Sequence, residues 1–284
     1  MNAVANTPTD PPSELRFRRR VHTLAALAQL WRSRELIRTL SERELRARYK
    51  QAVLGFAWAV LVPITYMLVF TVFFRRVATI DTEGVPYALF SYVGLLPWTF
   101  FSTAVALGGT SLLSNLSLLN KVYCPREVFP IASVGVAGID TAIATVALGL
   151  LFVITTFMPQ IAGVWWIPVL LLVQVGFTLG VVLLLSSVIV YVRDVRHLLP
   201  IILQLGVFAT PVAYGLDAVP GEAQWIYSLL NPLAPVIDGY RQTILYGQTP
   251  DLFLLGLGAI SALLWLVVGY TVFKRLETGI ADVA

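Results

Sequence analysis

Long apolar runs separated by short polar segments make up most of this chain. Each run has about 20 residues or more, the length that a helix needs to cross a hydrocarbon core roughly 30 Å thick. The runs are continuously apolar and lack the alternation typical of barrel strands, so they indicate helices. The pattern predicts an all-α polytopic membrane protein with six spans: Val53–Phe74, Tyr87–Leu107, Phe129–Met158, Val164–Val192, Leu198–Leu216 and Leu252–Phe273.

The chain changes character within the stretch SERELRARYKQAVLGFAWAVLVP, Ser41 to Pro63. Six charged residues lie in its first ten positions and none in the remainder. Ser41 and Glu44 fit a capping box, and Leu40 and Leu45 fit a hydrophobic staple. We therefore expect an interfacial helix on the cytoplasmic leaflet to end near Leu40. A second helix would start at Ser41 and run into the membrane.

Two further features modify the simple picture of six straight helices. Pro63 and Pro97 lie midway through the first and second spans, so we expect a kink or break at each. Between Leu216 and Thr249 the chain has two apolar pieces that are each too short to cross, separated by Asn231-Pro232. The natural arrangement is a re-entrant pair of short helices that dip back into the outer leaflet between spans five and six.

Composition and charge support a membrane location and give an orientation. Hydrophobic residues make up 57% of the chain and charged residues 13%, against about 25% charged in soluble domains. Of the 20 Lys and Arg residues, 17 fall on one side of the six-span topology, leaving Arg75, Arg76 and Arg241 on the other. By the positive-inside rule, both termini are then cytoplasmic. The same charges explain the basic N-terminus without a nucleic-acid partner, and the single Cys124 excludes an internal disulfide.

The chemistry needed for an enzyme or a metal site is largely missing from the sequence. There are two histidines, and none of the zinc, redox, serine-hydrolase or P-loop motifs occurs. We therefore expect no cofactor on this chain and no nucleotide hydrolysis by it alone. Asp140 is the one charge deep inside a span, where a carboxylate needs a partner. It fits a helix-packing hydrogen bond, an ion pair with Arg241, or an ion relay.

Small and aromatic residues within the spans leave two further questions open. Gly176 and Gly180 form a G-x-x-x-G pattern that permits close helix packing, within the chain or between two copies. Aromatic residues gather in the first two spans, where they either pack against helices and lipid or line a channel on which sugar rings stack. These aromatic residues are Tyr66, Phe90, Tyr92, Trp98, Phe100 and Phe101.

The loop NKVYCPREVFP, Asn120–Pro130, mixes charges with apolar residues and lies between spans two and three. The topology places it in the cytoplasm. A short amphipathic element of this kind suits docking into a partner's cleft, whereas an ordinary loop would usually be more polar.

Six segments in order resemble one protein family. They are RELIRTLSERELRARYKQAVLGFAWAVLVP, LLNKVYCPREVFPIA, VRDVRHLLP, TPVAY, LNPLAPVIDGYRQTIL and FKRLETGIADVA. Together they resemble the permease, or type-2 membrane component, of ABC exporters for O-antigen, capsule and wall teichoic acid. The resemblance extends from about Arg34 to the C-terminus.

The resemblance implies a homodimer in the bacterial inner membrane that exports a lipid-linked glycan, with two separate ATPase subunits that carry ATP and Mg. It divides the chain into a flexible basic region (1–33), an interface helix (34–52), a six-span domain (53–273) and a cytoplasmic tail (274–284). The interface or gate helix would act through Arg43, Glu44, Arg46, Arg48 and Lys50. The ATPase-coupling element would act through Asn120, Lys121, Tyr123, Arg126 and Glu127. Aromatic residues line the channel of such permeases, so the resemblance implies four channel candidates: Tyr66, Tyr92, Trp98 and Phe101.

Alternative functions remain at this point. The cargo of an ABC permease could instead be a small lipid or a drug. A membrane enzyme of lipid-linked glycan synthesis would need acid or histidine clusters, and a secondary transporter would need more charges within the membrane.

Overall fold

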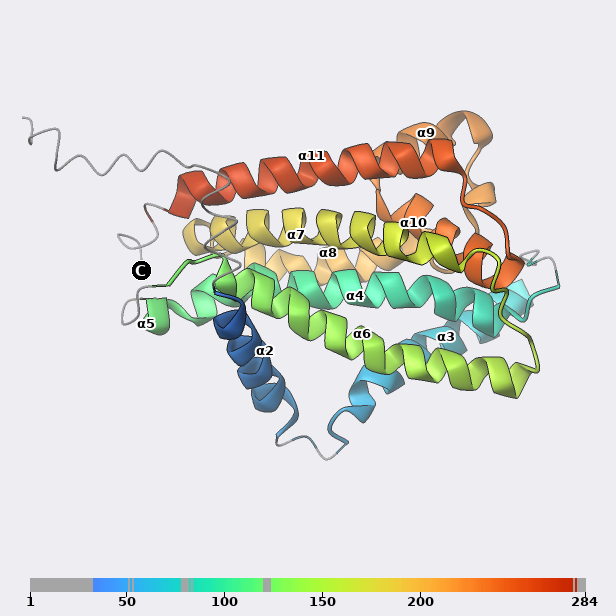
Figure 1. Cartoon of the computed structure of the whole chain (residues 1–284), viewed down its shortest axis with the longest axis horizontal. Coiled ribbons are helices and arrows are strands. Elements are labelled where there is room, and N and C mark those ends of the chain that lie inside the picture. Colours follow the sequence, from blue (N-terminus) through green and yellow to red (C-terminus); the bar gives the residue numbers. More distant parts are fainter. Residues whose placement is uncertain are drawn as a thin grey trace, which may run out of the picture.

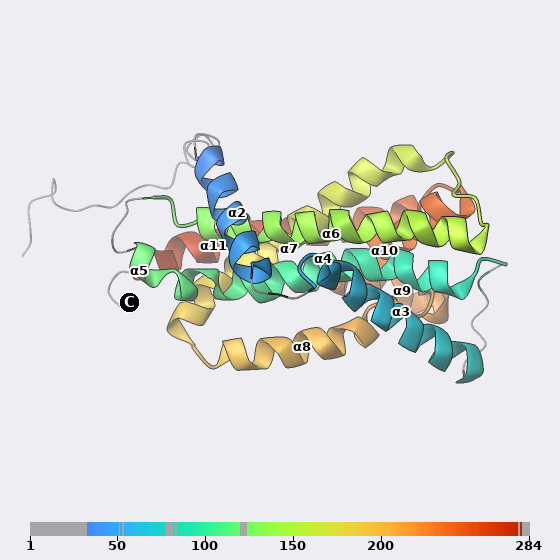
Figure 2. The ribbon, with the colours of Figure 1, turned by 90° about the horizontal axis from the view of Figure 1, so that it is seen from below.

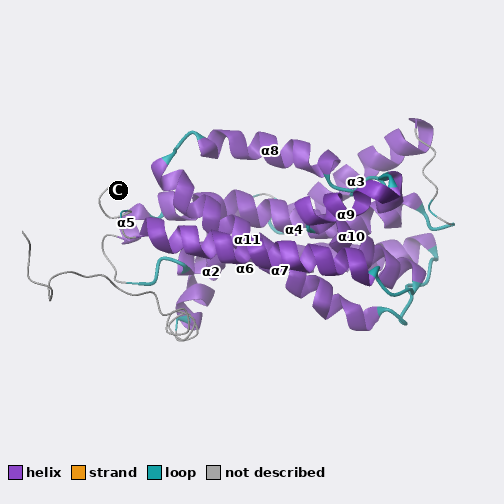
Figure 3. Ribbon diagram, turned by 90° about the horizontal axis from the view of Figure 1, so that it is seen from above, coloured by secondary structure: helices purple, strands orange, loops and turns teal. Residues whose placement is uncertain are grey.

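The structure is an elongated bundle of helices that run along one common axis (Figure 1). The computed structural model describes residues 33–50, 52, 54–77, 82, 84–119, 124–277 and 279. Every regular element in these ranges is helical (Figure 3). The elements are α2 (Arg34–Tyr49), α3 (Ala57–Val77), α4 (Tyr87–Ser114), α5 (Leu116–Leu119), α6 (Val128–Thr155), η2 (Val164–Trp166), α7 (Ile167–Tyr191), α8 (Val195–Ala209), η3 (Leu216–Ala218), α9 (Gly221–Leu230), α10 (Leu233–Arg241), the π-helical turn η4 (Gln242–Tyr246) and α11 (Leu252–Glu277).

Four helices in the described ranges are long and apolar enough to cross a membrane: α4, α6, α7 with the η2 turn before it, and α11. They coincide with four of the six predicted spans. The other two predicted spans correspond to shorter apolar stretches, Ala57–Phe73 within α3 and the whole of α8. Neither α3 at Pro63 nor α4 at Pro97 is interrupted, so neither helix breaks there. A kink at each proline, the other predicted outcome, stays a prediction.

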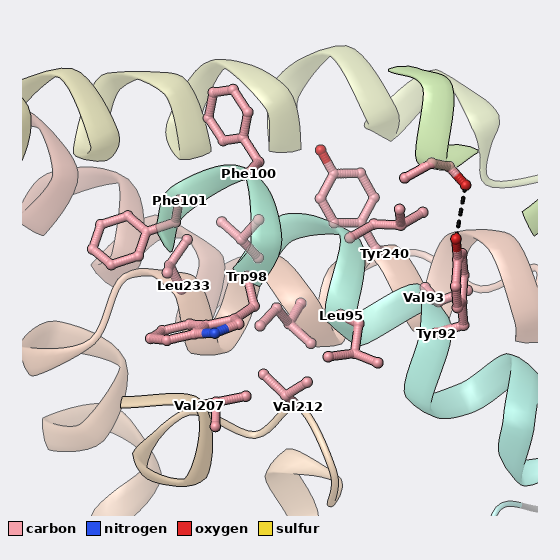
Figure 4. Close-up of a cluster of buried hydrophobic side chains, with 14 of the residues drawn as sticks. Tyr92, Val93, Leu95, Trp98, Phe100, Phe101, Val207, Val212, Leu233 and Tyr240 are labelled. Carbon is pink, nitrogen blue, oxygen red and sulfur yellow. Dashed lines mark hydrogen bonds between the residues drawn. The ribbon is translucent and has the colours of Figure 1, made fainter. Parts of the chain in front are cut away.

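The central helix is α4, which packs against α3, α6, α7, α8 and α10. It is apolar on all faces, as expected of a helix surrounded by others. Trp98, Val207 and Val212 belong to one buried cluster around it (Figure 4). The polar tips in this core have partners: the Tyr92 hydroxyl donates to the carbonyl of Ala144 at 2.9 Å, and the Tyr240 hydroxyl donates to Gln174 Oε1 at 3.1 Å.

The helices α7 and α11 approach each other closely at two glycines. A Cβ atom added at Gly269 would lie 2.0 Å from the carbonyl oxygen of Gly180, and one added at Gly180 would lie 2.5 Å from the Trp265 carbonyl. A Cβ atom at Gly176 would meet nothing within 4 Å. Gly180 of the predicted G-x-x-x-G pattern therefore packs within the chain.

The predicted helix boundary at Ser41 is wrong. The helix α2 runs without interruption from Arg34 to Tyr49. The Ser41 hydroxyl donates to the carbonyl of Ile37 at 2.9 Å and to that of Ala132 on α6 at 3.0 Å, so it does not cap a helix start. Packing on α6 overrides the local capping pattern, because a serine in a helix can bond back to the preceding turn.

The chain instead leaves the helix after α2 and starts again at α3, with Gly55 at φ +49° between them. The basic helix and the apolar helix are therefore separate elements. The interface helix predicted over residues 34–52 ends at Tyr49. The basic region predicted before it lies outside the described residues, except for Ser33.

Different elements lie at the two ends of the bundle. The ends of α7 and α11 and the start of α6 lie at the end where α5 is found (Figure 1). The helices α9 and α10, which correspond to the predicted pair of short helices, lie at the opposite end (Figure 1). Asn231 and Pro232 connect them, as the sequence predicts.

Candidate functional site: a lateral cavity and the basic end of the bundle

A cavity of about 550 Å³ opens on one side of the bundle. Figure 2 shows α3 and α8 along this side, outside α4. The walls of the cavity come from these three helices, from α6 and from the end of α2. Side chains that line it include Arg48, Trp58, Tyr66, Trp98, Asp140 and Gln204.

An ion pair between α2 and α6 lies at one wall of this cavity. Arg48 Nη1 is 2.8 Å from Asp140 Oδ2, and the Tyr49 hydroxyl donates to Asp140 Oδ1 at 2.8 Å. Burial and the nearby carboxylate raise the pKa of Tyr49 to about 12, so its hydroxyl stays protonated as the donor. The structure thus gives Asp140 two packing partners, both from α2. The alternative partner, Arg241, is wrong, because its guanidinium bonds elsewhere.

Asp140→Asn is expected to keep the activity of the chain and to lower the stability of the purified chain by about 1–2 kcal/mol, because the amide oxygen still accepts from Tyr49 while the charge facing Arg48 is lost. Thermal unfolding and an activity assay measure the two effects. Glu42→Gln is the control, since its ion pair with Arg38 is exposed and contributes little. Loss of activity with unchanged stability would contradict the packing role and favour a proton or ion relay.

The helix α2 contacts α6 through one face. Ser41, Leu45 and Tyr49 are the buried residues on it, at helical spacing. The Ser133 hydroxyl donates to Glu44 Oε2 at 3.2 Å, and burial raises the pKa of the Glu44 carboxyl above its usual range. This helix is therefore firmly attached to α6 at its C-terminal half.

The remaining predicted gate-helix residues divide between the bundle and the surface. Arg43 donates to Asn115 Oδ1, beyond the end of α4, at 2.7 Å. Among the residues that the structure describes, Arg46 pairs with Glu42 of its own helix at 3.8 Å, and its side chain is exposed. Lys50 is also exposed. Arg46 and Lys50 can therefore reach headgroups or a partner, whereas Arg43, Glu44 and Arg48 hold the helix to the bundle.

The predicted coupling residues do not all face outward. Asn120, Lys121 and Tyr123 lie outside the described residues. Arg126 is half-buried and donates to the carbonyl of Glu277. Glu127 is 2% exposed and its carboxylate contacts Lys274 on α11. In this conformation Glu127 cannot present its charge to a partner, so the predicted direct contact through Glu127 needs correction.

The four aromatic channel candidates occupy two environments. Tyr66, 40% exposed, and Trp98 line the cavity. Tyr92 is fully buried, and Phe101 stacks on Phe177 with ring centroids 5.2 Å apart, so both belong to the interior of the bundle and not to the cavity wall. Sequence reasoning missed Trp58, which is 49% exposed and also lines the cavity. The position of Trp58 near the start of a predicted span is the sequence signal that could have identified it.

At the opposite end, Arg241 is buried and bonds to four backbone carbonyls. They belong to Phe90, Pro211, Val212 and Tyr214, at 3.2, 2.8, 2.6 and 2.9 Å. Its guanidinium also lies 3.7 Å from the centroid of the Phe90 ring. Arg241 thereby joins α10 to α4 and to the segment after α8. The sequence named Arg241 only as a possible partner of Asp140, and its bonds to these carbonyls were not visible there.

In the part of the chain that the structure describes, no three His, Cys, Asp or Glu side chains lie together so that they could hold a metal ion. The ABC-2 type transporter family matches residues 35–245, from the start of α2 to the π-helical turn after α10. The matched range includes the residues that line the cavity and the residues through which α2 contacts α6 and Asn115. The chain belongs to the ABC-2 type transporter family.

Relatives of this ABC-2 family chain are similar over nearly their whole length. The O-antigen export system permease protein RfbA of Myxococcus xanthus is 35% identical over 240 residues, which cover 84% of this chain and 91% of that protein. RfbA of Klebsiella pneumoniae is 26% identical over 249 residues, covering 88% and 95%. The polysialic acid transport protein KpsM of Escherichia coli is 24% identical over 253 residues, covering 85% and 93%. The prediction of an ABC permease is therefore confirmed.

Proposed function

We propose that this chain is the permease subunit of an ATP-driven exporter that moves a lipid-linked polysaccharide, or a related cell-surface glycan, across the bacterial inner membrane. The observation that carries the proposal is the 35% identity to an O-antigen export permease over 91% of that protein's length. A second relative, the polysialic acid transport protein, is named for a different polysaccharide, so the proposed cargo class is polysaccharide and not one particular polymer.

The proposed topology has six spans, with both termini in the cytoplasm. The four long helices cross the membrane with α3 and α8. Since α8 has 15 residues, it covers only about 22 Å, and the segment after it completes the crossing of a core roughly 30 Å thick. The cation-rich end of the bundle is cytoplasmic by the positive-inside rule. The helices α9 and α10 then form a re-entrant pair at the external end.

Energy for transport would come from separate subunits. The chain lacks the P-loop pattern that cradles nucleotide phosphates, so ATP and Mg would be held by two ABC ATPase subunits bound to a homodimer of this chain. The segment before α6 is the proposed docking element on the permease, with Lys121 and Tyr123 as its proposed contacts. The helix α2 would lie at the membrane surface among lipid headgroups. The distribution of Lys and Arg residues is explained by membrane orientation, so no nucleic-acid partner is proposed.

The cavity between α3, α4 and α8 is the proposed contact surface for the glycan. Aromatic rings stack on sugar faces, and several weak sites in succession allow a polymer to slide. Trp58, Tyr66 and Trp98 supply such rings on its walls. Trp98 also packs against Gly206 of α8, so it forms part of the wall itself.

Replacing Trp58 or Tyr66 with alanine is expected to reduce glycan export and leave thermal stability nearly unchanged, because both rings are half-exposed. Export of polymer to the cell surface and the melting temperature of the purified chain are the two measurements. Trp165→Ala is the matched control, since this ring is 87% exposed and does not line the cavity. Normal export by a variant with both Trp58→Ala and Tyr66→Ala would show that these two rings do not contact the glycan.

The decisive test reconstitutes the chain in liposomes with and without a co-purifying ABC ATPase. We expect lipid-linked glycans to stimulate ATP hydrolysis and to be moved only when both proteins are present. Transport by the chain alone would contradict the proposal and favour a secondary transporter. Stimulation by small lipids or drugs, with no response to glycolipids, would change the cargo. Chemical turnover of the glycolipid without export would instead favour an enzyme.

A further inference from the structure

The last turn of α11 is bonded to the residues directly before α6. The Glu127 carboxylate contacts Lys274 Nζ, and Lys274 also lies 2.8 Å from Glu277 Oε2. The side chains of Glu127 and Lys274 are 3% and 16% exposed. Arg126, the neighbour of Glu127, donates to the main-chain carbonyl of Glu277. Two consecutive residues of the segment before α6 are thus attached to one turn of α11.

The same turn of α11 is also attached to α7. The Tyr191 hydroxyl, at the end of α7, donates to the carbonyl of Leu276 at 2.7 Å. Phe273 packs in one apolar cluster with Phe129 at the start of α6 and Val190 near the end of α7. A displacement of Glu127 therefore acts on α11 at a point where α6 and α7 also meet it.

A buried ion pair is a poor way to obtain stability alone, because desolvation offsets much of its attraction and an apolar pair of similar shape is often as stable. Its best-attested use is to define one register between elements. Two polar atoms of this network make no hydrogen bond to the described residues. They are Glu127 Oε2 and the hydroxyl of Tyr270, one turn before Lys274, and both are buried. A filled structural network would leave neither group unbonded.

We propose that Glu127 and Lys274 form a latch that transmits movement of the segment before α6 to α11. Glu127 is a positioning residue whose counterpart is on the same chain and not on the ATPase. The inference rests on the proposed function, since the movement is driven by the motor subunit that docks on residues 120–126. It also makes α11 a moving part of the transport cycle.

Reciprocal charge reversal in the complete permease–ATPase complex tests the latch. Glu127→Lys and Lys274→Glu are each expected to lower the amount of glycolipid moved per ATP hydrolysed by at least about tenfold, with ATPase binding retained. The double reversal is expected to restore most of this ratio, because the introduced lysine can pair with the introduced glutamate and with Glu277. A double variant as defective as the single variants would overturn the latch.

One further variant keeps the test informative if a reversal prevents folding. Glu127→Gln with Lys274→Met keeps the shape and removes both charges, and it is expected to hydrolyse ATP while moving little cargo. Normal coupling by this variant would also overturn the latch. The matched control neutralises the exposed Arg38–Glu42 pair, as Arg38→Gln with Glu42→Gln, and is expected to leave the amount of glycolipid moved per ATP unchanged.

The outcomes separate the latch from the proposed function. If the unmodified complex moves glycolipid with ATP but double reversal does not rescue, only the latch fails. If the unmodified complex moves no glycolipid, the proposed function fails. If Glu127→Lys is rescued by a charge change on the ATPase and not by Lys274→Glu, then Glu127 contacts the motor directly and the latch is wrong.

Discussion

Gly269→Ala is expected to lower the free energy of unfolding by about 2–3 kcal/mol, because overpacking a tight interface costs this much. The added Cβ would lie 2.0 Å from the carbonyl oxygen of Gly180, which is main chain and cannot rotate away. The helices α7 and α11 would have to separate along their whole contact. For a chain of this size, the melting temperature would fall by roughly 3–5 °C, measurable by heating the detergent-solubilised protein and following the monodisperse fraction.

The same two helices supply matched controls for this experiment. A Cβ atom at Gly256 on α11 or at Gly176 on α7 would meet nothing within 4 Å. Gly256→Ala and Gly176→Ala are therefore expected to be neutral or slightly stabilising, since alanine is the better helix former by about 1 kcal/mol. Equal melting temperatures for Gly269→Ala and Gly256→Ala would show that the close approach of α7 and α11 is not needed. A fall for Gly176→Ala alone would favour the alternative that this glycine packs between copies.

The long apolar helices were predictable because a helix that crosses hydrocarbon must be apolar over its whole crossing length. Four of the predicted spans coincide with helices that are long and apolar enough to cross a membrane, among them Tyr87–Ser114 for the predicted Tyr87–Leu107. The bounds of α2 were harder to predict. The capping pattern at Ser41 is a local signal worth about 1 kcal/mol, and contact with Ala132, far along the chain, outweighs it. Such a contact leaves no trace in the local sequence.

The site was predictable in its residue types and not in its pairings. A carboxylate inside a span needs a partner, and Asp140 has one, but its partner Arg48 is 92 residues away. Likewise, Tyr92 and Trp98 lie on a helix that is apolar on every face, so no periodicity separates the ring that lines the cavity from the ring that packs inside. Glu127 was predicted to contact the ATPase because it lies in the coupling element that the family resemblance implies, and only the position of Lys274 shows that it is buried.

Arg241→Met is expected to reduce stability further still, by about 4 kcal/mol or more, because each buried carbonyl that loses its donor costs about 1–3 kcal/mol. Four carbonyls depend on this guanidinium, and three of them belong to residues 211–214, where the chain is not helical. We expect the segment after α8 to detach from α4 and α10. Thermal unfolding would show the loss, and faster proteolysis within residues 210–216 would locate it.

Gly94 provides an independent variant for the same contact. A Cβ atom at this position would lie 2.5 Å from Arg241 Nη2 and 3.0 Å from the Val212 carbonyl oxygen. Gly94→Ala should therefore expel the guanidinium and be strongly destabilising alone, but should add little to Arg241→Met, since residues that share one contact are not additive. Arg193→Met, at an exposed arginine, is the control and should melt like the unmodified chain. If Arg241→Met melts like Arg193→Met, or if its effect and that of Gly94→Ala simply add, then Arg241 does not hold together the end of the bundle where α9 and α10 lie.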